Sequence, residues 1–384
     1  MIKLAYDTIS DSEIGSLCEW LKTNPRLTKG DLTVEYERLW SKKIGCEYSV
    51  FVNSGSSALL IAVYSLIESG ALKRGDAVIV PALSWATDLS PVVQLGLKPV
   101  LCDCNLTDLS VDIDHLKELA STEKAKALIL VSVLGLVPEM DDIVEFCEEQ
   151  NIIIIEDACE SLGSSYKNKK LGNFGKMSCF STYYGHHLST IEGGMVCTDD
   201  EDLFNLLKSL RSHGWDRDMS SKHSSSLKQK FAVDNDFESQ YKFYHLGFNL
   251  RSTDLQAFLG INQLKRFDEI VEKRNDNYSL YRKALINSTW VPPKSKDDKY
   301  ISSFAYPVIH QNRAEIVKKL KENNIESRPL ICGSLGKQPF WTKNYGEVSL
   351  KNADYINDYG FYLPNNHQIT SNDIDYIKNV VGEL

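Results

Sequence analysis

The feature of this sequence that most constrains its fold is an alternation of short apolar runs with helical stretches. Runs such as ALILV at 127–131 and IIII at 152–155 carry no polar side chain. Strands without a polar face are typical of a parallel sheet that helices cover on both sides. The predicted strands are 48–52, 77–80, 99–103, 127–131, 151–155, 177–184 and 194–197, and the helices between them are 58–67, 87–95, 113–120 and 139–150. The alternation predicts an α/β fold with a doubly wound, mostly parallel sheet.

The length of the chain, 384 residues, favours two domains over a single core. We expect a large α/β domain over residues 1–265 and a small C-terminal α+β domain over 266–384. A long helix over 253–286 is predicted to link them, after an exposed polar excursion at 216–243. The other predicted elements are a helical segment over 1–47 anchored by Trp20 and Trp40, a helix at 201–212, a strand at 304–309, and helices at 314–323 and 372–381.

Composition and charge narrow the class of protein. A net charge of −9 disfavours nucleic acids and anionic membranes as partners, although a small basic pocket for a phosphate is compatible with it. The sequence has neither a signal-peptide pattern nor an apolar run of membrane-spanning length. Its nine cysteines lack framework spacing, and Cys102 and Cys104 form only a lone C-x-C pair. We therefore expect a soluble cytoplasmic protein with reduced cysteines and no metal site.

Candidate site segments follow the predicted strands, because ligands of open α/β sheets bind at the carboxyl ends of the strands. These segments are 54–57, 83–88, 156–160 and the connection after Tyr184. In the first, Ser54-Gly55-Ser56-Ser57 lies between a strand and a helix, where backbone N–H groups and hydroxyls point at an anion. A plain serine N-cap explains the same residues equally well.

The stretch 177–198 combines two apolar strands with a polar connection between them. This connection carries the adjacent His186 and His187, followed by Glu192, Gly193 and Gly194. Paired glycines allow close backbone approaches that a Cβ would block. Adjacent side chains in an extended segment point to opposite sides, which disfavours a zinc site built from the two histidines and assigns His187 to packing or hydrogen bonding.

Seven segments, taken in order, resemble the sugar aminotransferase family known as DegT/DnrJ/StrS. They are SGSSAL (54–59), VPALSWATD (80–88), EDACESLG (156–163), CFSTYYGHHLSTIEGGM (179–195), RSHGWDR (211–217), GFNLRSTDLQAFLG (247–260) and YLPNN (362–366). Members of this family are fold type I proteins that use pyridoxal 5'-phosphate (PLP) and act on nucleotide-linked keto-sugars. The resemblance covers nearly the whole chain and implies a homodimer with shared active sites, in which residues 1–265 bind the cofactor.

One departure from the family pattern implies a particular chemistry. The usual members have a lysine that binds the cofactor as a Schiff base, and the matching position here is His186. An imidazole cannot form that bond, but it moves protons near neutral pH. The substitution resembles the 3-dehydratase branch, which uses pyridoxamine 5'-phosphate (PMP) and removes the C3 hydroxyl of a 4-keto-6-deoxy sugar. His186 is then the base, its imidazolium protonates the leaving oxygen, and L-glutamate restores the amine form of the cofactor.

Two subgroups of that branch differ in their nucleotide and in iron. The CDP-sugar subgroup carries an iron–sulfur cluster on late cysteines, whereas Cys332 alone follows Cys197 in this sequence. The length and the YYGHHLSTIEGGM stretch resemble the iron-free subgroup, which acts on a GDP-linked sugar, GDP-4-keto-6-deoxymannose, on the route to colitose in O-antigen. No motif in the sequence states how guanine is recognised.

The resemblance also implies roles for individual residues. Asp157 partners the pyridine nitrogen, Trp85 stacks on the ring, and Glu160 lies near the cofactor's 3-hydroxyl or amine. The alternatives are a helix-capping aspartate for Asp157 and an ordinary core tryptophan for Trp85. The remaining expected contacts are Gly55, Ser56, Ser57 and Ser181 with the phosphate, and Asn249 with the phosphate of the neighbouring subunit. His213 is either structural or substrate-binding. Arg328 is a candidate partner for the nucleotide diphosphate or for the carboxylate of glutamate, and the alternative is an exposed surface arginine.

Three other functions stay open at this point. The first is a nucleotide-sugar 4-aminotransferase that uses another lysine, although Lys169, Lys170 and Lys176 are poorly placed for it. The second is a CDP-4-keto-6-deoxyglucose 3-dehydratase. The third is a pseudoenzyme that binds cofactor or sugar without turnover, for which the same binding residues would be needed.

Overall fold

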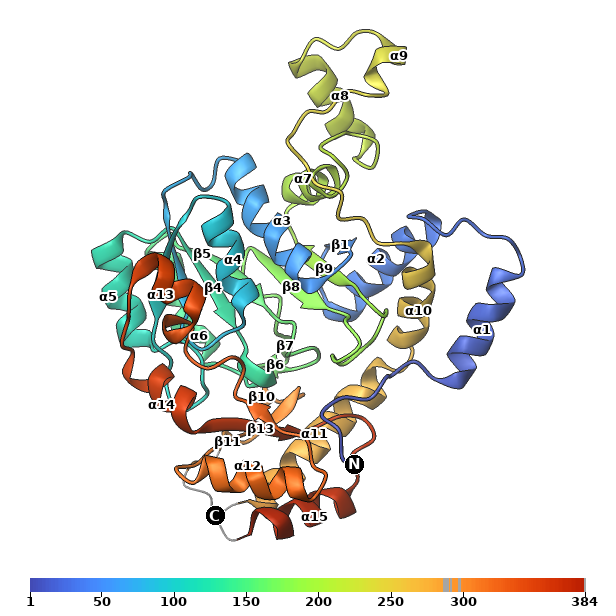
Figure 1. Cartoon of the computed structure of the whole chain (residues 1–384). Helices are drawn as coiled ribbons and strands as arrows, with labels where there is room; N and C mark the ends of the chain where they lie inside the picture. Colours follow the sequence, from blue (N-terminus) through green and yellow to red (C-terminus); the bar gives the residue numbers. More distant parts are fainter. Residues whose placement is uncertain (286–289, 291, 296–297, 383–384) are drawn as a thin grey trace.

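A seven-stranded sheet forms the centre of the molecule in the computed structural model, which describes residues 1–285, 290, 292–295 and 298–382 (Figure 1). Its strand order is β1-β9-β8-β5-β4-β2-β3. The strands are β1 (Tyr48–Val52), β2 (Ala77–Pro81), β3 (Lys98–Cys102), β4 (Ala127–Val131), β5 (Ile153–Asp157), β8 (Met177–Ser181) and β9 (Gly194–Thr198). Only β9 is reversed, since both of its pairings are antiparallel and the other pairings are parallel. The predicted doubly wound, mostly parallel sheet is confirmed.

Helices cover both faces of this sheet, and β1 shows how. Val50 and Val52 belong to one buried core together with α3 (Gly55–Glu68), whereas Phe51 belongs to a second core with Tyr36 and Trp40 of α2 (Asp31–Ile44). This is the two-residue period of a strand buried on both faces. The other helices of this part are α1 (Asp11–Leu21), α4 (Ala86–Gln94), α5 (Ile113–Glu123), α6 (Met140–Glu149), α7 (Glu201–Arg211) and α10 (Asp254–Leu264).

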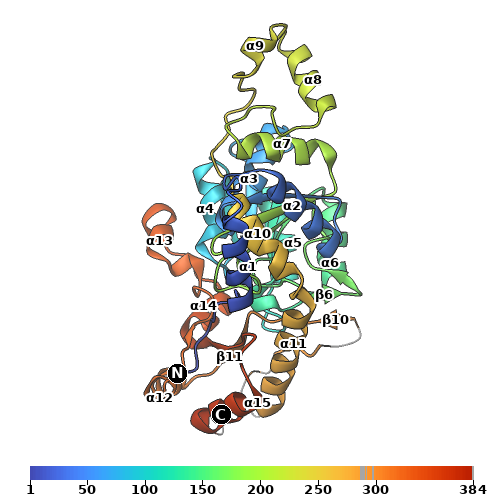
Figure 2. The same ribbon diagram turned by 90° about the vertical axis from the view of Figure 1, so that its right-hand side faces the viewer.

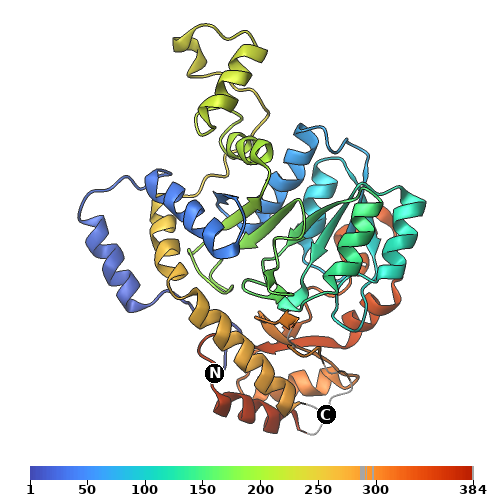
Figure 3. The same cartoon turned by 180° about the vertical axis from the view of Figure 1, so that it is seen from behind.

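A smaller sheet lies beyond the carboxyl ends of the central strands (Figure 3). It is antiparallel and consists of β11 (Ala305–Ile309), β13 (Gly360–Pro364) and β12 (Arg328–Pro329). A third short sheet joins β10 (Lys299–Tyr300) to β6 (Ser165–Tyr166) and β7 (Lys169–Lys170). The helices of the C-terminal part are α11 (Phe267–Ala284), α12 (Arg313–Glu322), α13 (Pro339–Tyr345), α14 (Lys351–Tyr359) and α15 (Ser371–Val381).

The single long helix predicted over 253–286 is wrong. The helix breaks after Leu264 and restarts at Phe267, and its predicted end at residue 286 lies outside the described residues. Contacts from a distant segment fix the break: Gln263 and Arg266 both donate hydrogen bonds to the carbonyl oxygen of Thr8, at 3.1 and 2.8 Å. No local glycine or proline marks this position, so periodicity alone does not reveal it.

The excursion at 216–243 is exposed, as predicted, but it is not irregular. It contains α8 (Ser221–Lys230) and α9 (Asp236–Ser239), and it projects from the body of the molecule (Figures 1 and 2). Trp40 is fully buried and Trp20 stacks on Phe258 with 4.9 Å between ring centroids, so both tryptophans act as packing anchors. Among the described residues no helix combines the length and the apolar character needed to cross a bilayer.

Candidate active site

A cavity of about 700 Å³ opens at the edge of the large sheet where its parallel strands end. All four segments expected at this edge contribute to its walls, and so do parts of the small sheet. The structure therefore brings together residues that are widely separated in the sequence. The predicted site residues that line the cavity are Gly55, Ser56, Trp85, Asp157, Glu160, Ser181, His186 and Arg328.

The N-terminus of α3 supplies donors for an anion. Ser54 caps this helix, and its side chain accepts a hydrogen bond from the backbone N–H of Ser57 at 3.1 Å. The N–H groups of Gly55 and Ser56 have no intrahelical partner, as at the start of any α-helix. A Cβ on Gly55 would lie 2.9 Å from Cβ of Ser181, so glycine is needed for this close contact. The free donors and the anionic preference of a helix N-terminus suit a phosphate.

Gly193 and Gly194 are required by close packing and not by backbone angles. A Cβ on Gly194 would lie 2.2 Å from the carbonyl oxygen of Ser54, and one on Gly193 would lie 2.3 Å from Oγ1 of Thr190. Neither glycine has a positive φ. The start of β9 therefore presses directly on the loop that begins α3, which is the close backbone approach expected of the paired glycines.

Asp157 is the last residue of β5, and its Oδ1 accepts a hydrogen bond from the N–H of Cys159 at 2.8 Å. Asp88, in the first turn of α4, lines the same cavity as Asp157. Burial, reinforced by the charge of Asp157, raises the pKa of Asp88 well above its usual value. Asp88 is absent from the predicted site residues, because its importance depends on the first turn of α4 and the end of β5 lining one cavity.

Trp85 stands at the mouth of the cavity. Its side chain is 57% exposed, although it is one of the largest apolar groups in the chain. The alternative of an ordinary core tryptophan is therefore wrong. A broad aromatic face beside a cavity suits stacking on a planar ring.

His186 lines the cavity from the turn between β8 and β9. Its Nδ1 is buried and has no hydrogen-bond partner within the described part of the chain. Burial lowers the pKa of His186 to about 4, and the nearby Asp157 carboxylate offsets only part of this shift. The imidazole is therefore neutral at pH 7 in the free protein, and its role as the base stays a prediction.

The pKa of Glu160 is shifted in the opposite direction, upwards. Its Oε2 accepts a hydrogen bond from the N–H of Leu134 at 2.7 Å, and burial raises the pKa of its carboxyl to about 8. The carboxyl therefore keeps a proton at neutral pH. A protonated carboxyl can donate a hydrogen bond as well as accept one, which suits a hydroxyl or an amine in the cavity.

Two cationic side chains of the cavity come from the N-terminal segment and from the small sheet. Arg328 enters from β12, and Lys3 lies in an N-terminal segment that bridges from Ile2 to Ile325. The place of this segment was not predictable from the sequence, since its contact joins residues more than 300 positions apart. Further lining residues that are absent from the predictions are Ser132, Tyr183, Glu192, Phe304, Glu326 and Tyr362, of which Tyr362 falls in the matching YLPNN segment.

Three of the predicted site residues do not line this cavity. Ser57 is engaged with Ser54 through its backbone N–H and its hydroxyl. Asn249 is exposed and pairs with Ser212 in an isolated β-bridge. His213 packs beside Trp215, with 5.4 Å between the ring centroids. The contacts expected of these residues remain predictions.

His187 points away from the cavity that His186 faces. It is fully buried, and its Nε2 lies 3.0 Å from the carbonyl oxygen of Ser302. Burial lowers its pKa well below the usual value. These contacts agree with its predicted assignment to packing and hydrogen bonding.

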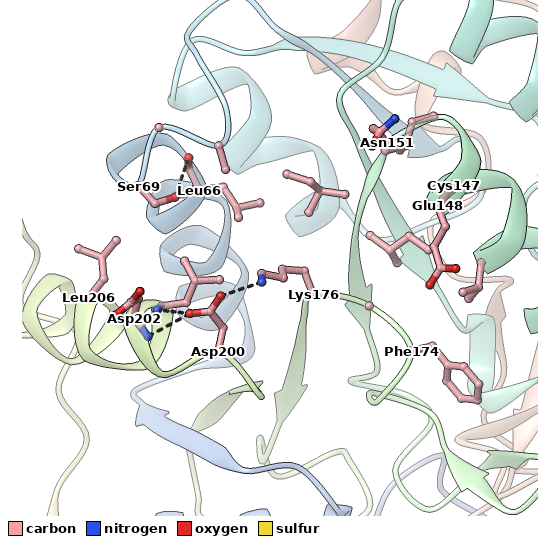
Figure 4. A pocket seen from close by; sticks show the side chains of 18 residues that line it. Leu66, Ser69, Cys147, Glu148, Asn151, Phe174, Lys176, Asp200, Asp202 and Leu206 are labelled. Carbon is pink, nitrogen blue, oxygen red and sulfur yellow. Dashed lines mark hydrogen bonds and ion pairs between the residues drawn. The ribbon is translucent and has the colours of Figure 1, made fainter.

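A second cavity, of about 990 Å³, lies where β5 and β8 begin, at the opposite edge of the sheet (Figure 4). Lys176 lines this second cavity and forms an ion pair with Asp200 at 2.7 Å. The whole of β8 separates Lys176 from Ser181 and the site cavity. Lys176 is therefore excluded as a lysine that reaches the site, and Lys169 and Lys170, which form β7, do not line the site cavity either.

The residues of the site cavity fit PLP or PMP. Free N–H groups at the start of α3 match a phosphate, and the Asp157 carboxylate matches a protonated ring nitrogen. Trp85 offers an aromatic face for the ring, and the imidazole of His186 lines the same cavity. The donor set therefore agrees with the cofactor that the sequence resemblance implies.

Comparison with known proteins agrees with this geometry. The DegT/DnrJ/EryC1/StrS aminotransferase family matches residues 8–382. The GDP-4-keto-6-deoxy-D-mannose 3-dehydratase of Yersinia pseudotuberculosis is 35% identical over 394 residues, which cover 99% of this chain and 97% of that protein. Two crystal structures of GDP-4-keto-6-deoxymannose-3-dehydratase match the whole of both chains with a TM-score of 0.91 and 31% identity. One is a histidine-to-asparagine variant with bound GDP-perosamine, and the other holds a trapped PLP-glutamate geminal diamine. The chain therefore belongs to the DegT/DnrJ/EryC1/StrS aminotransferase family.

Proposed function

We propose that this protein is a PLP/PMP-dependent 3-dehydratase that removes the C3 hydroxyl of GDP-4-keto-6-deoxy-D-mannose, with L-glutamate restoring PMP. The observation that carries the proposal is His186, which faces the cavity beside Asp157 from the connection where a cofactor-binding lysine is expected. The match to proteins named for this activity covers nearly the full length of both chains. Such an enzyme serves the biosynthesis of 3,6-dideoxy sugars such as colitose.

Bound PMP supplies an amine that condenses with the sugar ketone and a ring that takes up an electron pair. The chain's own residues hold and orient it. Gly55 and Ser56 bind the phosphate through their N–H groups, together with Ser181, and the Asp157 carboxylate keeps the ring nitrogen protonated. Trp85 covers one face of the ring and excludes water from it.

His186 moves the proton. Because its pKa of about 4 leaves the imidazole neutral at pH 7, Nδ1 is free to accept a proton from the reacting carbon. The same low pKa makes the resulting imidazolium a strong acid, and it passes the proton to the departing C3 oxygen, which leaves as water. Glu160, which is protonated at neutral pH, donates a hydrogen bond to a hydroxyl or amine nearby.

We also propose a homodimer with shared active sites. Asn249 and His213, which the family resemblance assigns to phosphate and substrate, lie outside the cavity of their own chain, so a second copy has to supply them. The projecting segment beside them carries exposed apolar side chains, among them Phe231 (51% exposed) and Phe237 (81% exposed). Exposed apolar groups gathered on one projection are typical of a protein interface.

The division of the chain into two domains and the location of the protein in the cell are further proposals. We infer a cofactor-binding domain over 1–265 and a small domain over 266–384, of which residues 383–384 lie outside the described part. The position of all seven central strands before residue 199 supports this division. A cytoplasmic location is supported by the cysteines, all nine of which are free.

The main competing function is a nucleotide-sugar 4-aminotransferase. It requires a lysine at the cofactor, and among the described residues that line the cavity the only lysine is Lys3, which is exposed and belongs to the N-terminal segment. A pseudoenzyme would keep the same binding residues, so turnover has to separate the two.

The proposed function is tested by incubating the protein with PLP, L-glutamate and GDP-4-keto-6-deoxymannose. We expect a GDP-sugar that lacks one oxygen. For each molecule of this product, one molecule of 2-oxoglutarate and one of ammonia should form. A GDP-4-amino sugar that keeps its C3 oxygen would identify an aminotransferase. Absence of 2-oxoglutarate would identify a binding protein, and preference for the CDP-linked sugar would reassign the nucleotide.

A further inference from the structure

Asp88 is a buried carboxyl without an obvious partner at the floor of the active-site cavity. It has no exposed surface, although it lines the cavity. One oxygen, Oδ2, accepts a hydrogen bond from the N–H of Trp85 at 3.2 Å. The other, Oδ1, is buried and meets no donor among the described residues. An ionised carboxylate with an unsatisfied oxygen is costly in such a place.

The titratable group that acts most strongly on Asp88 is another carboxyl, that of Asp157, which lines the same cavity. One oxygen of Asp157 is already fixed by the N–H of Cys159. The other titratable groups around the pair are Glu160, the imidazole of His186, and the thiols of Cys159, Cys179 and Cys332. Within the described part of the chain, no lysine or arginine is among the groups that act most strongly on Asp88.

We propose that Asp88 is a positioning residue for Asp157: its carboxyl keeps a proton and donates it in a hydrogen bond to the Asp157 carboxylate. Two buried carboxyls in contact ionise one at a time, and the less solvated one retains the proton. The raised pKa of Asp88 agrees with that assignment. Asp157 is then held from two sides, by Cys159 and by Asp88, and it remains the single anion that faces the ring nitrogen of the cofactor.

This inference rests on the proposed function for its consequence, but the proton on Asp88 can be tested without the cofactor. Asparagine in place of Asp88 keeps a donor of the same shape and cannot ionise. Leucine has a similar volume and removes the donor. Asp373 provides a matched control, since it also accepts the N–H of a helix-capping residue three positions earlier, but it lies in α15 far from the cavity.

The first experiment compares thermal unfolding of the cofactor-free wild type and Asp88→Asn between pH 5 and 8. In the wild type Asp88 is protonated when folded and ionised when unfolded, so folding takes up a proton and stability falls as pH rises. We expect the unfolding midpoint of Asp88→Asn to rise relative to the wild type as pH increases. Asp373→Asn should follow the wild type at every pH. A constant difference between Asp88→Asn and the wild type would overturn the proposal.

The second experiment measures PLP binding to the cofactor-free proteins by the absorbance of the bound chromophore. We expect Asp88→Asn to bind within about threefold of the wild type at pH 7, and Asp88→Leu to bind at least about tenfold more weakly, because the donor to Asp157 is lost. Equal binding by the asparagine and leucine variants would contradict the role of Asp88. If the wild type itself failed to bind PLP, the proposed function would be wrong. The proposed role of Asp88 towards the cofactor would then be wrong as well.

Discussion

At the scale of single residues, the active site is defined by groups whose surroundings push their pKa values apart. Burial lowers the pKa of His186 to about 4 and raises that of Glu160 to about 8, so at pH 7 both groups are neutral in the free protein. A neutral imidazole accepts a proton, and a neutral carboxyl donates a hydrogen bond. The cavity therefore contains a base and a donor whose roles follow from burial and not from residue type alone.

Replacement of His186 with Asn should flatten the acid side of the stability profile. The pKa of His186 is about 4 in the folded protein, against 6.5 for an ordinary histidine, so between these values only the unfolded chain binds this proton. The wild type thus loses stability as pH falls through this range, by up to roughly 3 kcal/mol from this group. Urea unfolding of both proteins from pH 7 to 4 measures the difference.

The comparison isolates one group, because His187 and His367, whose pKa values are also lowered, are present in both proteins. If His186→Asn and the wild type lost stability in parallel between pH 6.5 and 4, His186 would be charged in the folded protein, and the account of its neutral base would be wrong.

The residues of the site differ in how far they could be predicted from the sequence. His186, Asp157 and Trp85 were predictable because each lies in a short segment with a recognisable pattern at a strand end. Asp88 lies inside one of those segments, yet its proposed role depends on its place beside Asp157, which comes from a different element. The pKa shifts of His186 and Glu160 depend on how deeply the two side chains are buried, which a local sequence pattern does not predict.

At the scale of elements, the start of α3 is held in place by β9. Gly194 lies so close to Ser54 that no Cβ fits between them, and this contact fixes the helix N-terminus that is proposed to bind the phosphate. The strands themselves were easy to predict: the bounds of β1 and β4 agree with the apolar runs, since each is buried on both faces. The break between α10 and α11 was not predictable, because hydrogen bonds to Thr8, which is distant in the sequence, hold the helix ends in place.

Substitution of Gly194 by Ala should destabilise the protein and weaken PLP binding. The new Cβ would lie 2.2 Å from a backbone oxygen that cannot move away cheaply, and we expect a loss of about 3 kcal/mol in unfolding free energy. Gly15→Ala is the matched control, since nothing lies within 4 Å of its Cβ in the middle of α1. Alanine there should be neutral or stabilising by up to about 1 kcal/mol. Similar unfolding curves for the two variants would contradict the proposed contact.

Arg274 of α11 links the base to the C-terminal part of the chain. Its guanidinium is buried and donates to the carbonyl oxygens of Phe304 (2.8 Å), Asn365 and His186 (3.4 Å). Arg274→Met should cost roughly 3 kcal/mol of unfolding free energy, because buried carbonyl oxygens lose their donors. Arg38→Met, at an exposed ion pair with Glu35, should change it by less than about 1 kcal/mol. Equal effects of both substitutions would show that Arg274 has no special structural role.

At the scale of the whole molecule, the site is assembled from distant parts of one chain and is proposed to be completed by a second copy. Lys3, the central strands and Arg328 meet around one cavity, whereas Asn249 and His213 lie outside it. The segment containing α8 and α9 projects away from the body (Figure 2), where it exposes apolar side chains. This arrangement fits a dimer in which each chain reaches into the site of the other.

Mixing two inactive variants tests the shared site. His186→Ala and Asn249→Ala should each be nearly inactive as homodimers. A heterodimer places both substitutions in one site and leaves the other intact, so unfolding and refolding a 1:1 mixture should restore about a quarter of wild-type activity when the subunits pair at random. The same treatment of either variant alone is the control. No recovery in the mixture, with normal dimers present, would place both residues in the same site of one chain.

The most direct test of the central claim is a single turnover of the PMP-loaded protein with GDP-4-keto-6-deoxymannose, without glutamate, followed by product mass and cofactor absorbance. The wild type should release a sugar that lacks the C3 oxygen and leave PLP behind, whereas His186→Lys should not remove that oxygen. A wild-type product that keeps its C3 oxygen and carries an amine at C4 would contradict the account, because His186 would then not direct the reaction towards loss of the hydroxyl.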